Sequence, residues 1–513
     1  MLNGYLRDLA AAALAGCRQL REIGRSVVGL LKRVWVCALM ALALVRGGVF
    51  DAQQAFSVPG QAATAVLAAS RIPGPAVPDG LGVNIHFTNP RPGEMRMLAA
   101  TGVRWIRMDF AWGATETQKG RYNFAAYVRL ITALRRYHIR PLLILDYGNP
   151  LYQHGAFPTT PAARQAFAAW AAAAVENFRG SGVVWEMWNE PDGGMGNGGG
   201  GPIDPQAYAK LALETGQAIR RADQHAVFIG PALAWMQRPW KDGLTWVQWI
   251  FKGGVLRVFD AVSVHPYREQ PPETVIGDYR LFRRVANRGR SWGPESRGDY
   301  RLFRGVVANY APAGRSPPLV SSEWGYPSVP EWFYGRGYSS STQARFLARE
   351  FLVNLMCHVR LSIWYDWHDD GPAASATAGT GHVAPPNPEF HFGMVGFTYH
   401  AHRHWVYTPK PAFFACRTLT HTLCGFHFDK RLKENNPRDF VLVFANGHRR
   451  RWVAWSEVKP KPGRGVVTLP VPSGTYRVIN YLGAEHITTK AGVAGLKLQL
   501  STGPQYIVPQ RAK

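Results

Sequence analysis

Cysteine is scarce in this sequence, and none of the cysteines is arranged to bind a metal. There are 5 cysteines in 513 residues, and no two have the Cys-x-x-Cys spacing of a zinc site. The spacing argues against a zinc centre of that type. Cys416 and Cys424 could pair in an oxidising compartment, or both could be free thiols on a helix.

Acidic residues are also few. Asp and Glu total 34 against 59 Lys and Arg, which gives a formal net charge of +25. The basic residues are spread along the chain without a compact block of Lys, Arg and aromatics, so a nucleic-acid-binding module is not indicated. A basic surface of this kind suits contact with an acidic polymer, lipid headgroups or the cell envelope. With 46% hydrophobic and 18% charged residues, a globally disordered chain is excluded.

The N-terminal region has no apolar run long enough to cross a bilayer comfortably. Basic residues precede the apolar stretch 34–45, a pattern typical of an export signal, and the long leader also allows a retained inner-membrane anchor. Residues 14–17 resemble a lipobox as a second possibility. We therefore expect residues 1–50 to be an export signal or membrane anchor and 51–78 a linker. The expected location is periplasmic or extracellular, and an inner-membrane anchor is also open.

Residues 79–424 alternate short β-branched or aromatic runs with amphipathic helical patterns. This alternation predicts an α/β fold with a parallel sheet, and eight such units predict a (β/α)8 TIM barrel. The candidate strands are 81–87, 103–110, 141–147, 183–190, 226–233, 260–267, 318–324 and 361–367. The candidate helices include 125–137, 161–178, 205–222, 342–358 and 411–423.

Residues 425–513 have a different pattern, of short alternating strands separated by Gly and Pro turns. This pattern predicts a small antiparallel, β-sandwich-like domain. We expect this domain mainly to pack against the barrel, although glycan binding is also open. Its candidate strands are 440–445, 451–456, 465–470, 475–480 and 496–508.

Two glutamates occupy the ends of predicted barrel strands, where catalytic groups of such barrels gather. The fourth strand ends in Asn189-Glu190-Pro191, and the seventh ends in Glu323-Trp324-Gly325. Strands four and seven can face each other across the barrel mouth. Two carboxylates with separate roles are what glycoside hydrolysis needs, because one donates a proton to the leaving oxygen and the other attacks the anomeric carbon. The sequence therefore predicts a glycosidase.

These motifs resemble those of the retaining glycoside hydrolases that share the Asn-Glu-Pro signature, known as clan A. Within that superfamily the chain is most similar to family 39 and to related bacterial exopolysaccharide endoglycosidases, over roughly residues 80–510. The resemblance implies that Glu190 is the acid/base and Glu323 the nucleophile. It also implies that neither a metal nor an organic cofactor is required.

The same resemblance assigns substrate-binding roles to residues around the two glutamates. Asn189 would bind the sugar 2-hydroxyl, Tyr267 would hydrogen-bond Glu323, and Arg107 would lie near the nucleophile. His265 matches the site histidine, and Trp364 matches the platform under the −1 sugar. From its position on the first strand, His86 is either a subsite residue or a core histidine.

Several other acids have a structural interpretation. Glu186 lies deeper on the fourth strand than Glu190 and is expected to be a buried, paired acid. Asp109, Asp146 and Asp192 lie at strand ends, where they would either touch sugar hydroxyls or cap loops.

The expected substrate is a polysaccharide, and an exopolysaccharide is favoured. Long loops at 193–204, 268–316 and 368–410 indicate a shaped groove, and the second contains a tandem duplication of residues 277–283 at 298–304. No nucleic-acid partner is expected, and membrane association would come from the N-terminal segment. The alternative is a catalytically silent glycan-binding or polysaccharide-biosynthesis accessory protein on the same fold.

Overall fold

A computed structural model describes residues 72–510, with gaps at 199, 237, 277–299, 330, 333–334, 371–374, 377–382, 385–386, 401–403 and 462–463. The expected export signal or anchor and most of the expected linker lie outside the described residues, as does the first copy of the duplication. No helix in the described part of the chain is both long enough and apolar enough to cross a membrane.

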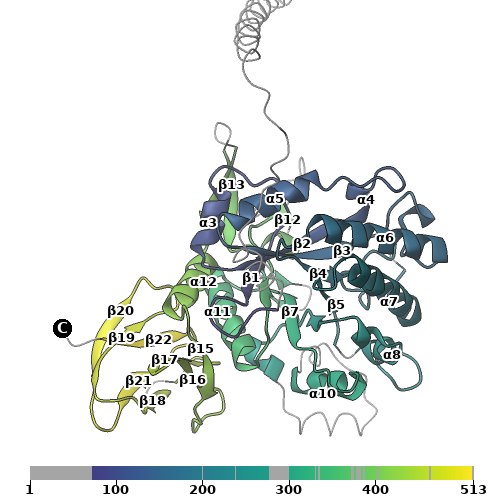
Figure 1. The fold of residues 1–513 in the computed structure, drawn as a ribbon. Helices are drawn as coiled ribbons and strands as arrows, with labels where there is room; N and C mark the ends of the chain where they lie inside the picture. The colour runs from purple at the N-terminus through teal and green to yellow at the C-terminus, as the bar shows by residue number, and fades with distance from the viewer. Residues whose placement is uncertain are drawn as a thin grey trace, which may run out of the picture. The chain divides into compact units, whose positions relative to one another are not determined.

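Eight parallel strands close into a barrel, as the sequence predicts (Figure 1). Each strand pairs with the strands that precede and follow it among the barrel strands, and the last pairs with the first. The strands are β1 (Leu81–Asn84), β2 (Trp105–Ala111), β3 (Arg140–Asp146), β4 (Val184–Met187), β5 (Val227–Leu233), β6 (Ala261–Val264), β7 (Leu319–Trp324) and β10 (Ser362–Trp364).

Helices follow the strands and cover the outside of the barrel. The longer helices begin at residues suited to that position: Thr160 and Asp204 cap α6 and α7, and proline occupies the first turn of each. The predicted helices are confirmed with ends that move by at most two residues. The helices are α3 (Glu94–Ala100), α4 (Trp112–Thr115), α5 (Ala125–Arg135), α6 (Pro161–Asn177), α7 (Pro205–Ala222), α8 (Trp246–Lys252), α10 (Tyr300–Tyr310), α11 (Ser340–Met356) and α12 (Pro411–Thr422).

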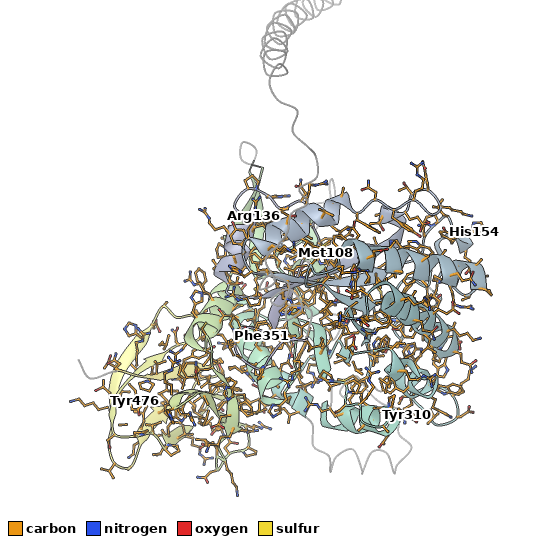
Figure 2. All side chains as sticks on the ribbon, in the orientation of Figure 1. Met108, Arg136, His154, Tyr310, Phe351 and Tyr476 are labelled. Atoms are coloured by element: carbon orange, nitrogen blue, oxygen red, sulfur yellow. The ribbon has the colours of Figure 1, made fainter. Side chains whose placement is uncertain are left out.

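The barrel interior is filled by alternate residues of its strands. Leu142 and Ile144 on β3 point inward, as do Ile363 on the last strand and Leu361 just before it, and they belong to one buried cluster. The strand residues that alternate with these inward-pointing ones belong to the larger core under the helices. That core contains Phe351 (Figure 2). This alternation decides which side chains at the strand ends can reach the barrel mouth.

Residues after the barrel form the predicted antiparallel domain. Its main sheet has the order β15-β16-β17-β22-β19-β20, and β18 pairs with β21. Tyr476 is one of its core residues (Figure 2). The strands are β15 (His427–Arg431), β16 (Asp439–Asn446), β17 (Arg449–Ser456), β18 (Val466–Leu469), β19 (Gly474–Ile479), β20 (His486–Ala491), β21 (Leu496–Gln499) and β22 (Gln505–Pro509).

The expected strand 496–508 is wrong, because the structure divides it into β21 and β22. Residues between the two strands include Gly503-Pro504, and proline lacks the N–H that a continuous ladder needs. The sequence also gave no sign of β15 and β20. Both strands are largely exposed, so they lack the alternation of apolar and polar residues by which a strand is recognised.

The loops after the later barrel strands contain short hairpins. They are formed by β8 (Glu331–Trp332) with β9 (Gly335–Arg336), β11 (Ser375–Ala376) with β12 (Val383–Ala384), and β13 (Val395–His400) with β14 (His404–Pro409). Cys416 and Cys424 are free thiols, the first buried and the second exposed.

The barrel and the β domain share one hydrophobic core and a buried polar cluster. Trp455 of β17 donates its indole N–H to Glu273 Oε1 at 2.6 Å, and the same oxygen accepts a hydrogen bond from Arg349 Nε of α11 at 2.6 Å. Phe440 and Tyr506 of the β domain belong to the same core cluster as the barrel helices. The expected packing of this domain against the barrel is present.

Candidate active site

The two predicted catalytic glutamates meet at the end of the barrel where the strands terminate. Glu190 follows β4, and Glu323 is the penultimate residue of β7. One carboxylate oxygen of each glutamate and one ring nitrogen of His265 all lie within 4.8 Å of one another. Both glutamates are half-buried. The two carboxyl groups are therefore close enough together for one glycosidic bond to contact both.

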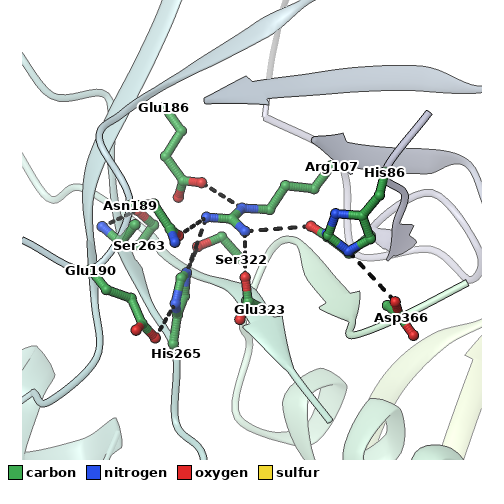
Figure 3. A network of polar contacts seen from close by, with 12 residues as sticks. His86, Arg107, Glu186, Asn189, Glu190, Ser263, His265, Ser322, Glu323 and Asp366 are labelled. Atoms are coloured by element: carbon green, nitrogen blue, oxygen red, sulfur yellow. Dashed lines mark hydrogen bonds and ion pairs between the residues drawn. The ribbon is translucent and has the colours of Figure 1, made fainter. Parts of the chain in front are cut away.

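Arg107 is the centre of the polar network around these residues (Figure 3). Its guanidinium donates to Glu323 Oε2 at 2.6 Å, to Glu186 Oε2 at 2.7 Å and to Asn189 Oδ1 at 2.8 Å. Burial disfavours the charged guanidinium, but the carboxylates of Glu186 and Glu323 outweigh burial and raise the pKa of Arg107. The barrel therefore holds a permanent positive charge against one oxygen of Glu323.

Tyr267 holds the other oxygen of Glu323. Its hydroxyl donates to Glu323 Oε1 at 2.8 Å. Burial raises the pKa of Tyr267 well above its usual range, and the charge of Glu323 raises it further. The phenol remains protonated and can act as a donor, so that each oxygen of Glu323 has one fixed partner.

His265 connects the two glutamates. Its Nδ1 lies 2.9 Å from Glu190 Oε1, and its Nε2 lies 3.3 Å from Arg107 Nη2. Burial lowers the pKa of His265 to about 4, so the ring is neutral near pH 7. Because arginine can only donate, Nε2 must accept in that contact, which leaves Nδ1 to carry the proton toward Glu190.

The backbone before Glu190 does not continue the strand. β4 ends at Met187, and Trp188 and Glu190 have φ values of 62° and 46°, in the left-handed region that non-glycine residues rarely adopt. The expected strand 183–190 therefore runs three residues past the end of β4 and begins one residue before it. Buried Trp188 donates to Met195 O at 2.9 Å, and Glu190 N donates to Ala232 O at 3.0 Å. These contacts hold a turn that presents the Glu190 side chain to the mouth.

Two of the neighbouring acids, Glu186 and Asp192, have the expected structural partners, whereas both carboxylate oxygens of buried Asp146 have no hydrogen-bond partner among the described residues. Glu186 is completely buried and forms its ion pair with Arg107. Asp192 accepts hydrogen bonds from the backbone N–H groups of Ala234 and Trp235 at 2.9 and 2.8 Å, so it caps that loop. Burial raises the pKa of Asp192 to about 7.

His86 lies at the barrel mouth beside Asp366, which follows the last strand (Figure 3). Its Nε2 is 3.5 Å from Asp366 Oδ2, and its ring meets that of Tyr365 edge-on with centroids 5.6 Å apart. The side chain of His86 is 37% exposed. The core-histidine alternative is therefore wrong, and His86 is placed where it can reach a ligand.

Trp364 does not occupy the position that the resemblance implied. It is completely buried, and its indole N–H donates to Phe392 O at 3.2 Å. Because Ile363 points into the barrel, its neighbour Trp364 points into the helical layer. A sugar has no exposed face of this ring on which to stack, and the prediction for Trp364 as a platform is wrong.

Tyr365 is the aromatic residue that the sequence analysis missed. It is half-buried, and burial together with the nearby charges of Asp366 and Glu323 raises its pKa. The alternation of Leu361 and Ile363 would have predicted an inward Tyr365. Glu389 was also missed: burial raises its pKa, and so do the charges of Glu323 and Glu190, but it comes from a loop that carries no sequence signal.

In the part of the chain that the structure describes, two sets of side chains are close enough to share an ion, namely Glu190, His265 and Glu323, and His86, Asp366 and Asp370. In the first set, one oxygen of Glu323 already contacts the guanidinium of Arg107, and a second cation beside it would be repelled. In the second set, His86 is the cation that faces Asp366. Neither donor set needs a metal for its charge to be balanced.

Comparison with solved structures shows that the chain shares its fold with several glycoside hydrolases. A family 39 glycoside hydrolase from Bacteroides cellulosilyticus WH2 is 22% identical with a TM-score of 0.66, over 85% of this chain and 81% of that one. A family 39 β-xylosidase from Caulobacter crescentus is 18% identical with a TM-score of 0.55, over 85% and 98%. A family 30 endoxylanase from Clostridium papyrosolvens C71 is 11% identical with a TM-score of 0.53, over 85% and 98%.

No protein-family model matches the sequence, and no curated protein matches it. The chain thus has a glycoside hydrolase fold, with structural similarity to families 39 and 30. The identities are low, so the comparisons describe the fold and leave the reaction and the substrate to be proposed from the site.

Proposed function

We propose that this protein is a retaining glycoside hydrolase that cleaves O-glycosidic bonds of a polysaccharide. The observation that carries the proposal is the approach of Glu190 and Glu323 to within 4.8 Å. Retaining enzymes place their two carboxyl groups about 5–5.5 Å apart, whereas inverting enzymes leave roughly 6.5–9.5 Å for a water molecule. The short separation supports a covalent intermediate rather than direct attack by water.

The neighbours of each glutamate support the division of roles. Glu323, held by Arg107 and Tyr267, would attack the anomeric carbon while Glu190 donates its proton to the departing oxygen. Water would then attack the glycosyl-enzyme bond, with Glu190 accepting the proton of that water. Asn189 is fixed beside both glutamates by Arg107 and by its amide donation to Tyr147 OH at 3.0 Å, which suits binding of the sugar 2-hydroxyl.

The proposed substrate is an exopolysaccharide. Support comes from the half-buried site between long loops, where Tyr365 and His86 can contact a sugar ring and its hydroxyls. Residues 1–50 remain the predicted export signal or membrane anchor, so a periplasmic or extracellular site of action is part of this proposal.

The first test is hydrolysis of a polysaccharide panel, read as new reducing ends and product masses, with the anomeric configuration of the first product followed by NMR. Glu323→Gln and Glu190→Gln should each lower kcat by at least about 10⁴-fold. Azide should partly restore turnover in a variant lacking the acid/base on substrates with a good leaving group, giving a glycosyl azide. Glu176→Gln, on the exposed face of α6, is the matched control and should keep full activity.

A first product of inverted configuration would overturn the retaining mechanism. Unchanged hydrolysis in Glu323→Gln would overturn the assignment of the nucleophile. Binding of glycans without release of reducing ends from the whole panel would favour the accessory-protein alternative.

A further inference from the structure

A cavity of about 470 Å³ lies between α12 of the barrel and strands β19 and β20 of the β domain. We call it the basic groove, because four of its lining residues are basic and none is acidic. The basic residues are Arg417, His421, Arg477 and His486. None of the lining residues comes from the strand ends that carry the candidate active site, so the groove is a separate feature (Figure 1).

The two arginines of the groove, Arg417 and Arg477, are brought to it by the fold without a carboxylate to neutralise either of them. In the described part of the chain, neither Arg417 nor Arg477 forms a salt bridge, whereas Arg450 nearby lies 3.9 Å from Asp429. Instead, the guanidinium of Arg417 lies over the rings of Phe413 and Phe414, 5.9 and 5.2 Å from their centroids. Aromatic contacts hold an arginine in place while leaving its N–H donors available.

Like charges also affect one another in this region. Burial lowers the pKa of His421, and the positive charge of Arg417 lowers it further. Burial lowers the pKa of Arg451, and the charges of Arg449 and Arg477 add to that effect. A cluster of cations that repel one another in the free protein is stabilised when an anion binds between them.

The wall of the groove depends on close packing. Gly483 has φ of 75°, and a Cβ atom there would lie 2.5 Å from Thr418 Oγ1 of α12. A glycine is therefore required for the turn 482–484 to approach the helix. Half-buried Phe414 and buried Ile479 supply an apolar surface below the basic side chains. A concave site with an apolar floor and a cationic rim matches a chain of sugar rings that carries negative groups.

We propose that the basic groove binds an acidic polysaccharide at a site separate from the catalytic glutamates. Guanidinium groups can pair with carboxylates through two parallel hydrogen bonds, and half-buried Phe414 can contact a sugar ring. The net charge of +25 favours association with such a polymer. If the protein is the polysaccharide hydrolase proposed above, this second site keeps the polymer near the barrel and raises its effective concentration at the catalytic site.

The test uses the full chain and isothermal titration with polygalacturonate oligomers and with neutral dextran oligomers, at low and high NaCl. The protein should bind polygalacturonate, with an affinity that falls as salt rises, and should not bind dextran. The double variant Arg417→Gln/Arg477→Gln should weaken polygalacturonate binding at least about tenfold, since each arginine donates charge-assisted hydrogen bonds.

The control is Arg129→Gln/Arg136→Gln, which removes the same charge from exposed positions on and just after α5 (Figure 2). Equal weakening of polygalacturonate binding in both double variants would show that only overall charge matters, and it would overturn the proposed role of the basic groove. Binding to phosphatidylglycerol vesicles with none to polygalacturonate would assign the groove to lipid and also overturn it. Because binding is measured without turnover, a failure of the hydrolase proposal would appear separately, as absent hydrolysis by a protein whose groove still binds.

Discussion

Glu190 and Glu323, the two proposed catalytic residues, are the same amino acid, and their neighbours make them chemically different. Glu323 receives hydrogen bonds from a permanently charged arginine and from a tyrosine. Glu190 lies beside the neutral imidazole of His265, as Figure 3 shows. A carboxylate with two fixed donors is oriented for attack, whereas a carboxyl beside a neutral ring can hold and release a proton during the reaction.

Tyr365 and Trp364 are adjacent in sequence and should respond oppositely to substitution. Tyr365→Ala should raise KM about tenfold with little change in stability, because a half-buried ring facing the site is lost. Trp364→Phe should leave KM unchanged and lower the free energy of unfolding by about 1–3 kcal/mol, because the buried hydrogen bond to Phe392 O is lost. Steady-state kinetics and urea unfolding of both variants check this. The converse pattern would restore Trp364 as the sugar platform.

The His86 and Asp366 pair should make stability depend on pH. Burial lowers the pKa of His86, but the contact with Asp366 outweighs it and the result is a rise to about 9. Burial raises the pKa of Asp366 to about 8. Both groups bind protons more tightly in the folded chain than in the unfolded one, so folding loses their contribution as pH rises.

For Asp366 the loss of stability falls between pH 3.8 and about 8, and for His86 it falls between the unfolded and folded pKa values of His86. Its contribution is complete below pH 6.5 and is lost as pH rises through about 9. The Tm of the unmodified protein should decline over this range, and the Tm of His86→Gln should decline less steeply. His225→Gln, at an exposed histidine, is the control. A His86→Gln profile parallel to that of the unmodified protein would show that the pair does not control stability.

At the level of elements, the barrel could be predicted because each strand and helix has a strong local pattern. Strands such as β5 are buried throughout, and helices such as α7 have clear first-turn residues, so both can be recognised without a partner. β15 and β20 could not be predicted, because their residues are exposed and they exist only through pairing within the sheet. Tertiary pairing, rather than local pattern, forms these strands.

The candidate site could be predicted in part for a related reason. Glu190 and Glu323 stand in short motifs next to buried strands, and the structure brings them together. Trp364 was misplaced because the motif match ignored the alternation set by Ile363. Glu389 comes from a loop, and only the folded chain shows that it approaches both glutamates.

For the whole molecule, the important feature is that the barrel and the β domain are not independent. Glu273, in the loop after β6, forms a buried ion pair with Arg349 and accepts the indole N–H of Trp455 from the β domain. Arg349 also donates to Thr502 O at 3.4 Å. Removal of one partner from a buried ion pair is strongly destabilising, because the remaining charge stays buried without solvent to compensate it.

Removal of the β domain should therefore unfold the barrel rather than change its substrate range. A chain ending after Cys424 loses the Trp455 hydrogen bond and the packing of Phe440 and Tyr506 against the shared core. It should be insoluble, or soluble without a cooperative unfolding transition. The intact chain should unfold in urea as one transition when fluorescence and far-UV circular dichroism are compared.

Point variants keep this prediction testable if the truncated chain cannot be purified. Trp455→Phe should lower the free energy of unfolding by about 1–3 kcal/mol, since it leaves a buried carboxylate one donor short. Trp452→Phe is the control, because Trp452 belongs to the separate core of the β domain and does not contact Glu273. We expect the barrel and the β domain to unfold together. The loss of unfolding free energy in Trp455→Phe should therefore be the same whether the probe lies in the barrel or in the β domain. A truncated chain that unfolds cooperatively and hydrolyses substrate at the full rate would show instead that the barrel is stable alone.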